Sequence, residues 1–437
     1  MAYLNIPESD LPRVVIVGGG FGGIRLINRL VKKDRFQIVL IDKRNYHTFQ
    51  PLLYQVSSAG LDAGTIAYPL RKTVKRKTDK AFFRMGEALS IDSENQILNL
   101  DIGEIHYDYL VIATGSKTNF FGNKQIEQNA LRMKSVPQAL NIRSLILENF
   151  EEATITADKK KRQALLNFVI AGAGPTGVEL SGAIAEIRKN VVPHDYIDMD
   201  PNEIRIHLIE GQNKVLAPMS AKASKNAQKA LESMDVEIHL GEMVESYDGK
   251  TVKTKSGLTF DTETFIWTAG VTGAPIPGLK EEAFVNNTNR YRVNVFNQVH
   301  GYENIFAIGD IALMEKENYP KGHPMVAQPS IQQGTLLAEN LVRIIDQQEL
   351  EPFKYNDKGT MATIGRNKAV VDLKNAHFSG FFAWFIWMFV HLWFLVGFRN
   401  RVGTFLNWTY RYINYDRASR LIMRPFKEHR KELDDED

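Results

Sequence analysis

The sequence contains no cysteine. Thiolate catalysis, a redox-active disulfide, a cysteine-held iron–sulfur cluster and a structural disulfide are therefore excluded. Its 10 histidines show no spacing typical of metal ligands, so the sequence predicts no metal site. In any redox reaction of this chain, electrons must therefore pass directly between organic groups.

An excess of charge of one sign is also missing. The net charge is +3, from 54 basic and 51 acidic residues, which is too small to indicate a nucleic-acid partner. The basic run at 71–77 is more typical of a solvated helix face than of a lipid contact. The first thirteen residues carry Glu8 and Asp10 and no apolar stretch, so we expect no secretory or transit signal and a globular part that stays in the cytoplasm.

Two glycine-rich turns are present, and each follows an apolar strand and opens a helix. The first is Gly18-Gly19-Gly20-Phe21-Gly22-Gly23, and the second is Gly172-Ala173-Gly174-Pro175-Thr176-Gly177. In such a turn the first glycine permits the bend, the second lets a pyrophosphate approach the backbone, and the third lets helix pack on strand. The pattern predicts two dinucleotide-binding sites.

The similarity extends beyond the glycines. Each copy reaches a strand that ends in an acid, Asp42 or Glu210, placed to accept ribose hydroxyls. Each copy then closes on an apolar strand that runs into Ala113-Thr114-Gly115 or Thr268-Ala269-Gly270. Matching positions are about 155 residues apart, so the chain carries an internal repeat of domain size.

This organisation predicts an α/β fold with two Rossmann-like dinucleotide-binding domains and a C-terminal helical region that anchors to a membrane. We expect the first domain to be discontinuous, over 1–120 and 292–350, because 304–310 reads as a returning strand and 327–345 as a helix. The second domain is expected over 121–291, and a strand pair with the anchoring helices over 351–437.

The stretch from Phe378 to Phe398 has no formal charge and is rich in aromatic residues. A basic segment follows that suggests an amphipathic helix, with aromatic and aliphatic residues at helical spacing at 405, 408, 412, 415 and 422, and arginines at 399, 401, 411, 417, 420 and 424. Three readings stay open. A monotopic anchor in one leaflet, through residues 378–424, explains the aromatic content best; a spanning helix and a soluble dimer interface are the alternatives.

Taken together, these features resemble type II NADH:quinone oxidoreductases, the single-subunit NADH dehydrogenases of respiratory membranes within the pyridine nucleotide-disulfide oxidoreductase-like flavoproteins. The resemblance covers essentially the whole chain. It rests on residues 42–60, on Trp267-Thr268-Ala269-Gly270-Val271, on Ala327-Gln328 with Gln332, and on Val396-Gly397-Phe398-Arg399-Asn400-Arg401. Ser330 departs from the family pattern, in which an alanine is usual.

The family implies tightly but non-covalently bound FAD in the first site. The candidate FAD residues are Gly18, Gly20, Phe21, Gly22, Gly23, Asp42, Lys43, Asn45, Thr48, Gln50, Ala113, Thr114, Gly115, Asp310, Ala327 and Gln328. Asp310 resembles the family residue that accepts a ribityl hydroxyl. An ordinary helix N-cap is the competing reading of Asp310.

The family implies NADH in the second site. The candidate residues are Gly172, Gly174, Pro175, Thr176, Gly177, Glu179, Glu210, Ala269 and Gly270. Glu210 should favour NADH because a carboxylate accepts ribose hydroxyls but repels a 2′-phosphate. Glu179 is a candidate catalytic proton relay, with complementarity to the helix N-terminus as the plainer reading.

Gln328 and Gln332 are the candidate quinone residues, and Gln328 is also a catalytic candidate. The positive end of the helix that Gln328 opens would stabilise charge on a reduced flavin. The expected activity is NADH:quinone oxidoreduction without proton pumping, at the cytoplasmic face of a bacterial inner membrane, with a homodimer left open. An NADH-dependent reductase of a small electron-carrier protein and a nucleotide-binding redox sensor are the competing functions.

Overall fold

The computed structural model describes residues 4–75, 79–414 and 420–422. These residues fall into two compact units. The first unit is Met1–His47, Tyr68–Lys117 and Val271–Asp357, and the second is Thr48–Ala67, Thr118–Gly270 and Lys358–Asp437. The three-part division expected from the sequence stays a prediction.

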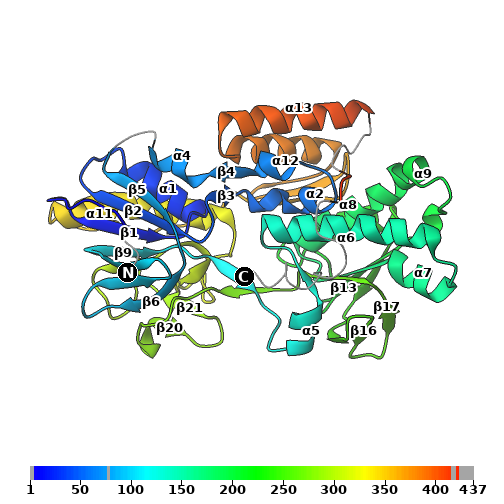
Figure 1. The fold of residues 1–437 in the computed structure, drawn as a ribbon, viewed down its shortest axis with the longest axis horizontal. Helices are drawn as coiled ribbons and strands as arrows, with labels where there is room; N and C mark the ends of the chain where they lie inside the picture. The colour runs from blue at the N-terminus through cyan, green and yellow to red at the C-terminus, as the bar shows by residue number, and fades with distance from the viewer. Residues whose placement is uncertain (1–3, 76–78, 415–419, 423–437) are drawn as a thin grey trace. The chain divides into compact units, whose positions relative to one another are not determined.

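The first unit is built on a five-stranded parallel sheet in the order β22-β9-β1-β2-β5. Its strands are β1 (Arg13–Val17), β2 (Gln37–Asp42), β5 (Ala81–Met85), β9 (Tyr109–Ile112) and β22 (Ile305–Ala307). Helices α1 (Phe21–Leu30) and α11 (Ala327–Ile345) pack on each other beside this sheet (Figure 1). The returning strand and the helix over 327–345 are therefore confirmed.

The second unit repeats this plan with the sheet order β11-β18-β12-β13-β14. Its strands are β11 (Leu131–Arg132), β12 (Asn167–Ala171), β13 (Arg205–Glu210), β14 (Val236–Leu240) and β18 (Thr264–Trp267). Helix α8 (Pro175–Asn190) follows β12 as α1 follows β1. The predicted internal repeat therefore appears as two sheets in which four strands hold corresponding places: β1, β2, β5 and β9 in the first and β12, β13, β14 and β18 in the second.

Each repeat also carries a small antiparallel sheet at the same point in the chain. In the first copy it is β6 (Ala88–Asp92), β7 (Ile97–Leu100) and β8 (Gly103–His106), and in the second it is β15 (Val244–Tyr247), β16 (Thr251–Thr254) and β17 (Thr259–Asp261). Apolar residues of β16 join a buried cluster with β12, β13 and β18. The long helix α6 (Val136–Ile155) lies in the same unit.

The segment from β24 to α13 is here named the C-terminal module. It consists of an antiparallel sheet, β24 (Thr360–Thr363), β25 (Ala369–Leu373) and β26 (Ala376–Gly380), followed by α12 (Phe381–Phe394) and α13 (Phe398–Asn414). The strand pair predicted from the sequence is confirmed, but the sequence missed β26. Phe378 pairs with Val371 of β25, and Gly380 has a φ of +77° at the point where the strand gives way to α12.

The uncharged stretch is consequently divided into the end of a strand, a helix of 14 residues and a turn before α13. Among the residues that the structure describes, no helix has both the length and the apolar character needed to cross a membrane. Of the predicted amphipathic segment, Phe405 and Trp408 lie in α13 and Ile422 lies beyond its end. Tyr415, Arg417 and Arg424 lie outside the described residues.

The third glycine of each turn is held by backbone contact. A Cβ atom added at Gly177 would stand 1.9 Å from the carbonyl oxygen of Gly172, and one added at Gly23 would stand 1.9 Å from that of Gly18. Gly172 and Gly18 themselves have φ values of +100° and +109°, which other residues rarely adopt. Both turns are thus closed by the same approach of helix to strand.

Replacing Gly177 by alanine should therefore destabilise the second unit, because the added methyl group meets backbone that cannot move aside. We expect Gly177→Ala to lower the free energy of unfolding by about 1–3 kcal/mol. Gly174→Ala is the matched control, since its added Cβ meets nothing within 4 Å. Urea denaturation followed by circular dichroism measures both, and equal stability of the two variants would contradict this account of the turn.

Candidate functional site

The first glycine turn is tied to the end of β2 by Asp42. Its Oδ2 accepts a hydrogen bond of 2.6 Å from the Gly19 amide, and its Oδ1 accepts one of 2.7 Å from the Arg44 amide. Burial raises the pKa of this carboxyl, while the two backbone hydrogen bonds oppose that shift. Asp42 therefore shapes the turn, and a carboxylate retains further lone pairs for ribose hydroxyls.

The second turn is tied to the end of β13 by the same pattern. Oε2 of Glu210 accepts 2.7 Å from the Ala173 amide, and Oε1 accepts 2.9 Å from the Gln212 amide. The two acids thus occupy equivalent positions, as the repeat predicted. The sequence did not show that each acid also binds the backbone of its own glycine turn.

The space beside each turn fits a pyrophosphate. A Cβ atom added at Gly20 or Gly174 would meet no atom within 4 Å, so the backbone at both positions is open. Phe21 and Pro175 begin α1 and α8, whose first amides carry the positive end of the helix dipole. Gly22 and Thr176 lie in the same first turns.

The closing strands cover the first glycine of each turn. A Cβ atom at Gly18 would stand 2.3 Å from the Ala113 carbonyl oxygen, and one at Gly172 would stand 2.5 Å from Cα of Ala269. Thr268, which precedes Ala269, donates to the carbonyl oxygens of Ala171 and Gly172 at 2.8 and 2.9 Å. Gly270 follows, with its carbonyl oxygen accepting from the Asn119 amide at 3.0 Å.

Asp310 does not cap α11. It lies in a 3-10 turn after β22, and its Oδ2 accepts 2.6 Å from the hydroxyl of Ser116, just beyond Gly115. Thr114 donates 2.7 Å to the Ala274 carbonyl oxygen. The helix N-cap reading of Asp310 is therefore wrong, because Ile308 is the N-cap of this 3-10 turn and Val326 is that of α11, and the side chain lies among the residues that follow β9.

His47 is a candidate residue of the first nucleotide site that the sequence did not predict. Its ring is 2% exposed, its Nδ1 lies 3.0 Å from the Gly19 carbonyl oxygen, and it meets the edge of Phe21 with centroids 5.1 Å apart. Burial lowers its pKa to about 4, so the ring is neutral at pH 7. His47 lies within the segment 42–60 on which the family resemblance rests, but nothing in the pattern distinguished it from its neighbours.

The remaining FAD candidates fall in both units. Lys43 and Asn45 follow β2 in the first unit, whereas Thr48 and Gln50 belong to the second unit. Lys43, Asn45 and Gln50 are exposed and Thr48 is half-buried. Their roles remain predictions.

Ala327 and Gln328 form the first turn of α11, as predicted. Ser330 packs where space is tight, because a Cβ atom at Gly309 would stand 2.8 Å from its hydroxyl oxygen. Gln332, predicted to contact the quinone, is instead bonded to the backbone of Asn356. Its amide nitrogen donates 2.9 Å to the Asn356 carbonyl oxygen, and its amide oxygen accepts 2.9 Å from the Asn356 amide, so both polar atoms already bind the backbone.

Glu179 lies in α8 and is buried beneath the C-terminal module. Its Oε1 accepts a long hydrogen bond of 3.4 Å from the Thr363 amide. Burial raises the pKa of this carboxyl to about 8, and the neighbouring Thr363 amide and Trp387 side chain only partly offset the shift. The indole nitrogen of Trp387 reaches hydrogen-bonding geometry with no described atom. Glu179 is therefore a neutral carboxylic acid at pH 7.

Two more positions on the same face of α8 contact the module. A Cβ atom at Gly182 would stand 2.8 Å from the Gly365 amide nitrogen, and Oε1 of Glu186 accepts a hydrogen bond from the Arg366 amide. Three successive turns of α8 thus lie against the turn at 363–366. The packing was not predictable from the sequence, since it joins segments about 180 residues apart.

An aromatic cluster adjoins Glu179. It consists of Tyr54, Trp387, His391 and Trp408. The rings of Trp387 and His391 stack with centroids 4.1 Å apart, and the indole of Trp408 donates 2.9 Å to the Gln55 side chain. His391 is held by this stacking and by its Nδ1, 2.8 Å from the Trp387 carbonyl oxygen, as a packed histidine rather than a ligand.

Two family models match this chain. Residues 12–334 match the pyridine nucleotide-disulphide oxidoreductase model, and residues 358–414 match the model of the NDH2 C-terminal domain. The second range is nearly that of the C-terminal module. The disulphide chemistry in the first name has no counterpart here, because the chain has no cysteine.

Relatives agree with these models. The chain is 37% identical over 433 residues to the type II NADH:quinone oxidoreductase Ndh of Mycobacterium tuberculosis, covering 95% of this chain and 92% of that protein. It is 29% identical to a type II NADH:quinone oxidoreductase of Haemophilus influenzae, covering 84% and 88%. The solved structure of NDH2 from Plasmodium falciparum with NADH has the same fold, with a TM-score of 0.85, 21% identity and coverage of 94% and 100%. The chain therefore belongs to the type II NADH:quinone oxidoreductase family.

Proposed function

We propose that this chain is an FAD-dependent NADH:quinone oxidoreductase that does not pump protons. The observation that carries the proposal is the presence of two equivalent glycine turns, one on each parallel sheet, together with a C-terminal module that presents aromatic side chains to solvent. Bound FAD supplies the chemistry, since it can accept a hydride from NADH and return two electrons to a quinone. The chain's own residues bind, orient and exclude water.

In the first unit, Gly20 leaves the backbone open to the FAD pyrophosphate, and Asp42 offers its remaining lone pairs to the adenosine ribose. Asp310, which accepts a hydrogen bond from Ser116, would accept a hydroxyl of the ribityl chain with its remaining lone pairs. The first turn of α11, with Ala327 and Gln328, would stabilise with its positive end the charge that develops on reduction of a bound flavin. Gln328 is thus the stronger of the two quinone candidates, since Gln332 would have to leave Asn356.

In the second unit, Gly174 leaves the backbone open to the NADH pyrophosphate, and Glu210 reads the ribose. No arginine follows Glu210 closely, since Gly211-Gln212-Asn213 come next. A 2′-phosphate would be repelled by the Glu210 carboxylate, which favours NADH.

Glu179 is the proposed proton relay. A carboxylic acid with a pKa of about 8 holds its proton at neutral pH and can release it to a group that has gained electrons. Its ordinary neighbours, the Thr363 amide and Trp387, do not ionise, so the raised pKa comes from burial. The family resemblance and the burial of the side chain are independent reasons to propose Glu179 as the relay.

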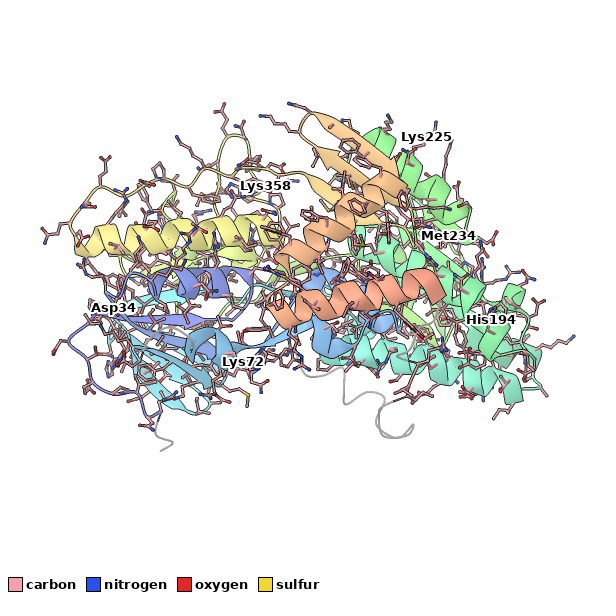
Figure 2. All side chains as sticks on the ribbon, turned by 90° about the horizontal axis from the view of Figure 1, so that it is seen from above. Asp34, Lys72, His194, Lys225, Met234 and Lys358 are labelled. Carbon is pink, nitrogen blue, oxygen red and sulfur yellow. The ribbon has the colours of Figure 1, made fainter. Side chains whose placement is uncertain are left out.

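The C-terminal module is proposed to lie on one leaflet of the membrane. On α12, Phe381, Phe385, Phe389 and Trp393 follow one another at four-residue steps and are 51–64% exposed. On the neighbouring α13, the exposed apolar residues are Phe398, Val402, Phe405, Leu406 and Tyr410. The two helices pack on each other and are drawn in pale orange (α12) and pale red (α13) in Figure 2. Exposed aromatic rings beside Arg399 and Arg401 suit the interface of a membrane, at the cytoplasmic face in a bacterium.

The proposed activity predicts two separable steps. Mixing the FAD-loaded chain with NADH should bleach the flavin absorbance, and vesicles carrying a long-chain quinone should restore it. A Phe385→Ser and Trp393→Ser double variant should keep the bleaching and the reoxidation by a water-soluble quinone. It should lose about tenfold or more of the reoxidation by vesicles, because less apolar surface enters the membrane. Stopped-flow absorbance measures each step.

Ile155→Ser is the control for this variant, because Ile155 is 84% exposed and lies on α6. It should behave as the unaltered chain does. Bleaching without any recovery on adding quinone would reject the quinone reductase and favour a reductase of a carrier protein. Absence of bleaching would reject an NADH-oxidising enzyme.

The charge of Glu210 should determine coenzyme choice. Glu210→Gln keeps an acceptor oxygen but removes the repulsion of a 2′-phosphate, so the ratio of kcat/KM for NADH to that for NADPH should fall by about tenfold or more. Steady-state kinetics with both coenzymes measures the ratio. Glu232→Gln, at an exposed position on α10 (Ala221–Glu232), is the control and should leave it unchanged. An unchanged ratio in Glu210→Gln would mean that other groups read the ribose.

The proton of Glu179 should matter for quinone reduction but not for hydride acceptance. We expect Glu179→Gln to slow quinone reduction by about 100-fold while NADH still bleaches the flavin. In the unaltered chain the rate should fall as the pH rises through about 8, where Glu179 loses its proton. The variant should lack this decline.

Glu186→Gln is the matched control, since it alters a carboxyl two turns further along α8 that also contacts the C-terminal module. The two variants should differ in the rate of quinone reduction and in the dependence of that rate on pH. If Glu179→Gln reduced quinone at the ordinary rate with the ordinary pH profile, Glu179 would have a structural role only.

A further inference from the structure

His207, Glu237 and His239 form a cluster on β14, an edge strand of the second parallel sheet, and on its neighbour β13. In the register of β13 and β14, His207 lies opposite Glu237, and Ile209 lies opposite His239. Glu237 and His239 are two residues apart on one strand, so their side chains leave the same face. One nitrogen or oxygen from each of the three side chains falls within 4.8 Å of the others.

Two of the three distances between these atoms are those expected in a tetrahedral metal site. Nδ1 of His207 lies 3.3 Å from Nε2 of His239 and 3.4 Å from Oε2 of Glu237. Ligand atoms bound at about 2.0–2.1 Å to a tetrahedral ion stand about 3.3–3.4 Å apart. The third distance, from the Glu237 oxygen to the His239 nitrogen, is at most 4.8 Å, and Glu237 is exposed, so its side chain has room to rotate.

The surroundings favour binding by neutral imidazoles. The ring of Phe260 on β17 lies 4.7 Å from that of His207 and 5.1 Å from that of His239, so one side of the cluster is apolar. His207 itself is buried, with 4% of its surface exposed, and such surroundings disfavour the charged imidazolium form. Arg205 lies 3.5 Å from the other oxygen of Glu237 and can orient the carboxylate.

We propose that His207, Glu237 and His239 bind a divalent transition-metal ion of the zinc type, with water in the fourth position. Two imidazoles and one carboxylate suit zinc, whereas magnesium and calcium prefer oxygen ligands alone. In the metal-free chain the two rings are close enough for a direct hydrogen bond, which the ion would replace. The ion would join the edge strand β14 to β13, whose last residue is Glu210.

The histidines stand 32 residues apart, which is why sequence spacing predicted no metal site. Parallel pairing brings them together, because β13 and β14 are joined by a crossover through α10. None of the three residues of the cluster belongs to the proposed nucleotide, quinone or lipid contacts. The inference is therefore independent of the proposed function.

Zinc binding to the full-length, FAD-loaded chain tests the proposal. After treatment with a chelator, the chain should take up one Zn²⁺ in isothermal titration calorimetry, and Co²⁺ should give the intense visible absorption of a tetrahedral site. His239→Ala should weaken Zn²⁺ binding by more than about tenfold and abolish the tetrahedral Co²⁺ spectrum. Glu237→Gln, which preserves shape at an exposed position, should also weaken it.

His194→Ala, at an exposed histidine of the same unit, is the control and should bind Zn²⁺ as the unaltered chain does. Thermal denaturation without metal establishes that each variant is folded. The proposal is overturned if the unaltered chain binds no Zn²⁺. It is also overturned if folded His239→Ala and Glu237→Gln bind with unchanged affinity, or if Co²⁺ shows only the weak spectrum of an octahedral ion.

Discussion

The contact of α8 with the turn at 363–366 connects the proposed chemistry to the C-terminal module. One helix begins at the glycine turn proposed to hold NADH and, along its next turns, offers Glu179, Gly182 and Glu186 to that module. Gly182 permits the approach because any side chain there would collide with backbone. The same approach removes the carboxyl of Glu179 from water, and the raised pKa follows from that burial.

The duplicated halves share more than their sheet order. Asp42 and Glu210 each bind two amides of the chain near their own glycine turn, so the acids stabilise the turns that the nucleotides would contact. The two halves differ in the elements that each carries beyond the repeat. The first receives β22, Asp310 and α11, whereas the second is covered by the C-terminal module. This difference supports assigning FAD to one half and NADH to the other.

Local signals predicted much of this structure. The glycine turns, the acids that end the strands and the helix at 327–345 all follow from patterns within short segments, and the repeat reinforced them. The prediction failed where a distant partner decided the outcome. Phe378 was counted in the uncharged stretch considered for a membrane anchor, because nothing nearby showed that it would pair with Val371. Thr363 and Trp387 as neighbours of Glu179, and His239 beside His207, likewise depend on packing between remote segments.

The protonation state of Glu179 is the central physical claim, and infrared difference spectroscopy measures it directly. The unaltered FAD-loaded chain should show a protonated carboxyl band that disappears as the pH rises through about 8. The band should be absent from Glu179→Gln and present in Glu186→Gln. A carboxylate band for Glu179 that is already fully developed at pH 6 would contradict the account, because it would show that burial under the C-terminal module does not keep the acid neutral.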